Sequence, residues 1–112
     1  MINYNNRQFR LVNNSENGET SGETVFYYKQ EGRIVSADYA GGKIQKGYLL
    51  GLVGEDGCIL FCYQQINIYN KLMTGTCTSR PEQLPNGKIR LHERWQWTSG
   101  DCSSGSSIVG EI

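Results

Sequence analysis

The sequence lacks an excess of charge of either sign, because 11 Lys and Arg residues balance 11 Asp and Glu residues. Nucleic acids and anionic membranes are recognised largely by clustered Lys and Arg, and the chain has no such cluster. It also has no apolar run long enough to span a bilayer and no apolar signal core near its first residue. These absences predict a cytoplasmic protein with no nucleic-acid or membrane partner.

Histidine and proline are scarce, with 1 His and 2 Pro, so possible metal ligands are few. The cysteines are Cys58, Cys62, Cys77 and Cys102. Cys58 and Cys62 would lie about 13 Å apart on an extended strand, too far to share one zinc ion. In a reducing cytosol we expect all four to be small buried apolar side chains. The number and spacing of these ligands therefore predict no metal site. Because no glycine-rich turn precedes a helix, the sequence also predicts no nucleotide or coenzyme cofactor.

Helical periodicity is also missing, and about eight segments instead alternate or cluster apolar residues between glycine-containing turns. Such strands form an antiparallel sheet in sequential order, which removes its exposed edges by closing. We therefore predict that residues 1–112 form a single domain. Its predicted fold is an up-and-down antiparallel β-barrel of about eight strands, calycin/lipocalin-like, with a β-sandwich as the alternative. The predicted strands span residues 8–12, 24–30, 33–40, 43–53, 58–67, 72–79, 88–98 and 103–112.

The clearest alternation lies in residues 87–100. One face of this strand carries Ile89, Leu91, Glu93, Trp95 and Trp97, which include both tryptophans of the chain. A carboxylate in the middle of an apolar face is costly to bury without a partner. The sequence therefore predicts that Glu93 faces either a polar network or a ligand.

Hairpin turns carry one face from strand to strand, because turn position fixes register. The predicted register pairs Val35 with Tyr48 and Tyr48 with Tyr63. It also pairs Gln65 with Gly75, where the missing side chain leaves room inside. A single bulge would invert every later side chain. The predicted inner face comprises Phe26, Tyr28, Val35, Ala37, Tyr39, Ile44, Lys46, Tyr48, Leu50, Leu52, Ile59, Phe61, Tyr63, Gln65, Asn67, Met73, Gly75, Cys77 and Ser79.

The interior of a barrel of about eight strands is either filled by side chains or holds one small ligand. Polar inner residues gather on adjacent predicted strands, a distribution that favours an aromatic pocket with a few polar contacts. The candidate ligand-binding residues are Tyr48, Tyr63, Gln65, Asn67, Cys77, Ser79, Glu93, Trp95 and Trp97. The alternative is a closed core, in which Glu93 is bonded to tyrosine hydroxyls or to Gln65 and the tryptophans only pack.

Two other hypotheses remain open. In the first, the pocket is catalytic and Glu93 is a general base with its pKa raised by apolar walls, since no other inward acid can be placed. In the second, the protein is structural or mediates interactions, for example as a homodimer. His92 is predicted to face solvent. Residues 102–107, rich in serine, are either a lid or a turn, and residues 13–22 have the composition of a flexible loop.

Three stretches carry a family resemblance: Tyr63-x-Gln65-x-Asn67, residues 72–82 and residues 84–101. They are similar to a family of small bacterial β-rich proteins commonly labelled "n-acetylglutamate synthase". The resemblance covers most of residues 1–112 and is densest from 63 to 101. Its label implies acyl transfer, with Glu93 as the base, but it supplies no catalytic residues to carry over. The chain lacks the glycine-rich turn and helix with which an acetyltransferase domain holds coenzyme A.

Overall fold

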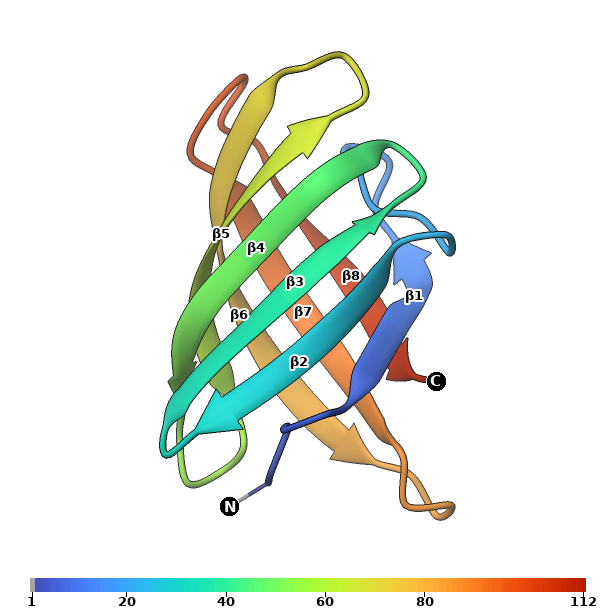
Figure 1. Cartoon of the computed structure of the whole chain (residues 1–112), viewed down its shortest axis with the longest axis vertical. Coiled ribbons are helices and arrows are strands. Elements are labelled where there is room, and N and C mark those ends of the chain that lie inside the picture. Colours follow the sequence, from blue (N-terminus) through green and yellow to red (C-terminus); the bar gives the residue numbers. More distant parts are fainter. Residues whose placement is uncertain (1) are drawn as a thin grey trace.

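The computed structural model describes residues 2–112, and every regular element within them is a strand. Each strand pairs antiparallel with the next, and β1 pairs with β8, so the sheet is a closed barrel (Figure 1). The predicted up-and-down barrel is confirmed, and closure rules out the sandwich. No helix in residues 2–112 is long and apolar enough to cross a membrane. The strands are β1 (Gln8–Asn14), β2 (Val25–Glu31), β3 (Ile34–Gly41), β4 (Ile44–Val53), β5 (Ile59–Asn67), β6 (Leu72–Gln83), β7 (Ile89–Trp97) and β8 (Ser104–Glu111).

Burial alternates along β7 as its sequence predicts. Ile89, Leu91, Glu93, Trp95 and Trp97 are all buried, and the residues between them are half-buried or exposed. The pleat of a strand sends successive side chains to opposite faces, so the alternation of apolar and polar residues is enough to show which face is inside. The inner face of the strand that carries both tryptophans is therefore determined locally.

The predicted register of β4 is wrong, and the error inverts the strand from Lys46 onward, whereas Ile44 is buried as predicted. A bulge between Tyr39 and Gly41 shifts the pairing, so Val35 lies opposite Gly51 and not opposite Tyr48. Gly41 adopts a φ of 119°, which favours glycine, and an added Cβ would strike the Glu23 backbone. Leu49 consequently points inward, whereas four residues predicted to face inward are exposed instead: Lys46, Tyr48, Leu50 and Leu52.

A second register error, in the β4–β5 hairpin, restores the predicted inward face from β5 onward. The predicted hairpin joined Leu52 to Ile59, but the structure pairs Leu52 with Leu60 and Val53 with Ile59. Two inversions cancel, so the inner positions of β5, β6 and β7 agree with the prediction. Other pairings differ by two residues, which leaves the inward face unchanged.

Inward glycines make room for aromatic rings on neighbouring strands. Gly75 lies opposite Tyr63, not opposite Gln65 as predicted, and the Tyr63 ring occupies the space that a Gly75 side chain would fill. Gly105 has the same relation to the ring of Trp95, since an added Cβ would lie 2.5 Å from its carbons. Gly47 has the same relation to the ring of Tyr39. The missing side chains of these glycines thus leave space for aromatic rings from the neighbouring strands inside the barrel.

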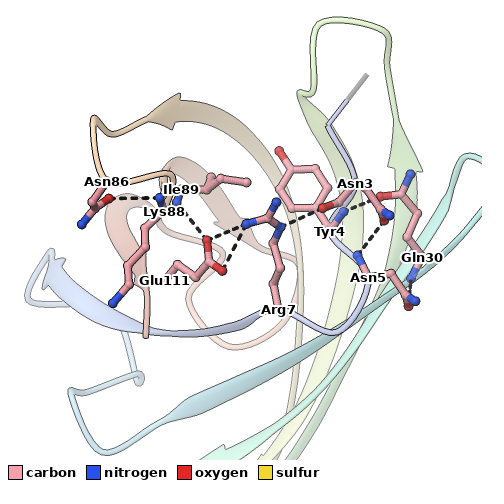
Figure 2. A network of polar contacts seen from close by, with 9 residues as sticks. All are labelled: Asn3, Tyr4, Asn5, Arg7, Gln30, Asn86, Lys88, Ile89 and Glu111. Atoms are coloured by element: carbon pink, nitrogen blue, oxygen red, sulfur yellow. Dashed lines mark hydrogen bonds and ion pairs between the residues drawn. The ribbon is translucent and has the colours of Figure 1, made fainter.

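The segment before β1 closes the end of the barrel at which both termini lie (Figure 1). Tyr4 is fully buried, and its hydroxyl donates to the Gly57 carbonyl in the β4–β5 turn. A polar clasp ties the same end together: Arg7 Nη1 donates to both carboxylate oxygens of Glu111, at 2.9 and 3.1 Å (Figure 2). Glu111 Oε1 also accepts from the Ile89 backbone N–H at 3.0 Å. This end is therefore packed and closed.

Candidate functional site

The opposite end of the barrel carries the β3–β4, β5–β6 and β7–β8 turns and the longer connection between β1 and β2 (Figure 1). We call residues 15–24 of that connection the capping loop. The barrel interior beneath it contains a cavity of about 50 Å³. Aromatic rings, polar groups of the strands and residues of the loop line it together: Asn14, Gly18, Glu19, Thr20, Phe26, Tyr39, Leu49, Phe61, Tyr63, Gln65, Cys77, Glu93, Trp95, Trp97 and Ser107.

Glu93 lies at the cavity wall in the middle of β7, between serines on the two adjacent strands. The Ser79 hydroxyl donates to Glu93 Oε2 at 2.6 Å, and the Ser107 hydroxyl donates to Oε1 at 3.2 Å. Burial raises the pKa of Glu93, and these two hydrogen bonds partly oppose the rise. The partners predicted for a closed network, tyrosine hydroxyls or Gln65, are therefore wrong. Each carboxylate oxygen keeps a lone pair that a further donor could use.

The two tryptophans form one aromatic wall with Tyr63. The Trp95 and Trp97 ring centroids lie 5.6 Å apart with an interplanar angle of 61°, and Tyr63 meets Trp97 edge-on at 5.6 Å. These geometries are favourable for aromatic pairs and fix the rings against one another. Trp97 Nε1 donates to the Asn17 carbonyl at 3.2 Å, so the wall also contacts the capping loop.

A chain of hydrogen bonds connects the barrel interior to the capping loop. The Tyr39 hydroxyl donates to Gln65 Oε1 at 2.8 Å. Gln65 Nε2 then donates to Glu19 Oε1, and Asn67 Nδ2 donates to Glu19 Oε2, both at 2.8 Å. Two amides of β5 thus hold one carboxylate of the loop.

Most of the predicted site residues meet at this end of the barrel. Six of them line the cavity: Tyr63, Gln65, Cys77, Glu93, Trp95 and Trp97. Ser79 donates a hydrogen bond to Glu93, and Asn67 donates one to Glu19. Tyr48 is the exception, since the β4 inversion places it on the outer face with 39% of its surface exposed. Whether these residues contact a ligand stays a prediction.

Sequence reasoning missed four polar residues that line the cavity, namely Asn14, Glu19, Thr20 and Ser107. Glu19 belongs to a segment whose composition predicts only a loop, and no periodicity marks it as inward. Ser107 belongs to the serine-rich segment, which is neither a lid nor a turn at that point but part of β8. Its pairing opposite Glu93 follows from the β7–β8 register. That register was the one signal in the sequence that could have identified Ser107.

The cysteines do not all behave as buried apolar side chains. Cys77 is buried at the cavity, and burial raises the pKa of its thiol. Cys62 and Cys102 are exposed and Cys58 is half-buried, contrary to the prediction. Cys62 points outward because its neighbours in β5, Phe61 and Tyr63, point inward. All four thiols are free.

A closed eight-stranded up-and-down barrel with a cavity beneath a capping loop is a calycin-type barrel. Residues 2–112 of the chain match the family described as avidin-like protein, and the chain therefore belongs to the avidin-like family. Comparison with curated proteins and with solved structures gives no match.

Proposed function

We propose that this protein binds a small, partly polar organic molecule in the cavity between Glu93 and the capping loop. The observation that carries the proposal is the cavity itself, which is lined by an aromatic wall and by a buried carboxylate. Sites for small molecules are typically built in this way, mostly apolar with a few fixed polar groups. Membership of the avidin-like family supports it, because barrels of this family typically bind small ligands such as biotin.

The polar groups of the cavity favour a ligand with at least one N–H donor. Glu93 accepts from two serines and has lone pairs to spare. Asn14 Oδ1 is buried and has no hydrogen-bond partner within residues 2–112. A buried acceptor without a partner is unfavourable, so a ligand N–H directed at it would gain affinity. The apolar part of the ligand would lie against Trp95, Trp97 and Tyr63.

The size of the cavity implies that the capping loop moves when a ligand enters. A cavity of about 50 Å³ is smaller than the roughly 150 Å³ that accommodates benzene. The strands around it are fixed by the closed sheet, whereas the loop contains no strand. Opening of this loop is therefore the least costly way to enlarge the site.

The contacts of Glu93 favour binding over acyl transfer with Glu93 as general base. Acyl transfer with a general base also needs a nucleophile or a second acid–base group beside it, and the groups that contact Glu93 are two neutral serine hydroxyls. The nearby Cys77 thiol has a raised pKa, which makes it a poor nucleophile. A ligand that donates to Glu93 without losing its proton requires neither group to react.

The outer face of β3, β4 and β5 supports self-association. The register aligns Ile34, Leu52 and Leu60 in one row across the three strands, and the next row contains Leu50 and Cys62. Leu52 and Leu60 are 61% and 65% exposed. Contiguous apolar surface of this kind marks an interaction site.

A second copy of this chain is the partner that best fits this face. Its charged border carries both signs, and Arg33 and Glu55 already pair there at 3.4 Å. Such a border attracts neither a strongly acidic nor a strongly basic partner, but it is compatible with an identical apolar face. Avidin-like proteins often form oligomers, which supports the same conclusion.

We also propose a cytoplasmic location. Cys62 and Cys102 are exposed free thiols, which persist in a reducing compartment and are oxidised elsewhere.

Ligand binding can be tested through the two tryptophans, which are the only ones in the chain and both lie at the cavity. Biotin is titrated into the protein while tryptophan fluorescence is recorded, and isothermal titration calorimetry gives the affinity. We expect saturable binding of biotin, or of another small molecule from a panel, and weaker binding to Glu93→Gln. If no compound changes the fluorescence of folded protein, the proposed function is wrong.

A further inference from the structure

The strongest unexplained contact at the site is that between the capping loop and the two amides of β5. Glu19 is the only loop carboxylate among residues 15–24 that reaches the barrel interior, where it accepts one bond from Gln65 and one from Asn67. Glu16 and Glu23, in the same loop, are exposed. Neutral hydrogen bonds anchor the loop as well. Ser15 N donates to the Ser106 carbonyl, and Thr24 Oγ1 donates to the Gly41 carbonyl. In the middle of the loop, Asn17 Nδ2 donates to the Ser104 carbonyl at 2.9 Å, and the Asn17 carbonyl accepts from Trp97 Nε1.

The two amides are held in place independently of Glu19. Gln65 and Asn67 are each only 3% exposed. Gln65 Oε1 accepts from the Tyr39 hydroxyl, and Asn67 Oδ1 accepts from the backbone N–H groups of Tyr69 and Lys71 at 3.0 and 3.1 Å. Because each amide oxygen has its own partner, the amide nitrogens keep their orientation if Glu19 leaves. They form a preorganised pair of donors whose geometry suits the two oxygens of a carboxylate.

We propose that Glu19 occupies the place of a ligand carboxylate, and that the ligands of this site are small carboxylic acids. On binding, the carboxylate of the ligand displaces Glu19 and takes the hydrogen bonds of Gln65 and Asn67. The capping loop opens, and the rest of the ligand extends past Trp97 and Tyr63 toward Glu93. This inference rests on the proposed function and adds to it the chemical class of the ligand.

The exchange explains how a buried pair of amide donors can stay satisfied in both states. In the closed state Glu19 satisfies them, and in the bound state the ligand does. A neutral ligand of the same shape would either leave these donors without an ionised acceptor or leave Glu19 in place and the loop closed. The site therefore discriminates for a carboxylate, and Glu19 acts as an internal competitor that lowers the apparent affinity.

The test compares hexanoate with hexanamide, in which a neutral amide replaces the carboxylate on the same chain. Both are titrated into wild type, Glu19→Ala and Glu16→Ala while tryptophan fluorescence is followed. Glu16→Ala is the matched control, because it removes the same charge from the same loop at an exposed position. We expect Glu19→Ala to bind hexanoate about tenfold more tightly than wild type, as for a competitor that fills the site about nine-tenths of the time. Hexanamide should bind weakly to all three proteins, and Glu16→Ala should match wild type.

A second measurement follows the loop in the wild-type protein. Hydrogen exchange of residues 15–24 should become faster when hexanoate saturates the site, because Glu19 is released. Equal hexanoate affinity of wild type and Glu19→Ala, or slower exchange in the loop, would overturn the inference. If acid and amide bind Glu19→Ala equally, the carboxylate preference is wrong while the proposed function stands. If neither binds any folded variant and the wider panel also fails, the proposed function itself is wrong.

Discussion

The Ser79 hydroxyl donates a 2.6 Å hydrogen bond to Glu93 Oε2 from directly across the β6–β7 pair. On the other side of the same strand, Ser107 donates to Oε1. The buried carboxylate is thus held by two neutral donors, and among residues 2–112 no cationic side chain donates to it. Neutral donors offset only part of the desolvation of a charge, which is why the pKa of Glu93 is raised.

The first prediction concerns the pH dependence of stability. Because the folded pKa of Glu93 is raised, its neutral form stabilises the fold below the ordinary pKa of 4.5, and this contribution is lost as pH rises through the folded pKa. Glu93→Gln lacks this titration. We expect the free energy of unfolding of wild type, relative to Glu93→Gln, to fall above pH 4.5 by at most about 1.4 kcal/mol per pH unit and then to level off. Urea unfolding at several pH values measures it. A difference in free energy of unfolding that stays constant with pH would show that the pKa of Glu93 is not raised by folding.

The second prediction concerns the fit between Gly105 and Trp95. A methyl group at Gly105 would lie 2.5 Å from the Trp95 ring and closer still to Ser15 Oγ, so both side chains must shift. We expect Gly105→Ala to lower the free energy of unfolding by about 1–3 kcal/mol, as for other overpacked cores, and to change the tryptophan fluorescence. Gly22→Ala is the control, because nothing lies within 4 Å of a Cβ at that position. If both variants have the same free energy of unfolding and the same tryptophan fluorescence, the position of the Trp95 ring does not depend on Gly105.

The third prediction concerns the outer apolar face. Leu52→Lys and Leu60→Lys each place a charge in the exposed row and should convert the oligomer to monomer without altering the far-UV circular dichroism. Size-exclusion chromatography with light scattering measures the mass. Val12→Lys is the control, since Val12 is 56% exposed on β1, outside this row. A monomeric wild-type protein would refute the proposed self-association.

The fourth prediction concerns the polar clasp at the closed end. Arg7 donates two bonds to a largely buried Glu111, whereas the Arg33–Glu55 pair is exposed and 3.4 Å long. Arg7→Met should therefore reduce the free energy of unfolding by about 1–3 kcal/mol. Arg33→Met should change it by less than about 1 kcal/mol. Both can be read from the midpoints of urea unfolding, and equal effects of the two substitutions would contradict the assigned role of the clasp.

Much of the barrel could be predicted from the sequence, because the relevant signals are local. Alternation in β7 fixes its inner face, and glycine-containing turns fix where the strands end to within a few residues. The opposition of Ser79 and Glu93 across adjacent strands was also predictable, since a hairpin keeps the parity of a face even when its register moves by two residues.

The sequence by itself therefore determined the strands, the closed antiparallel order and the inward position of Glu93 beside Ser79. The tertiary structure decided which way β4 faces, because the bulge lies at Gly41, whose backbone approaches that of Glu23 too closely for any side chain. It also decided that Glu19 enters the barrel, because that contact joins the loop to Gln65 and Asn67, 46 and 48 residues away. Local patterns carry no signal for contacts at such separation, which arise only when the closed sheet brings the amides beneath the loop.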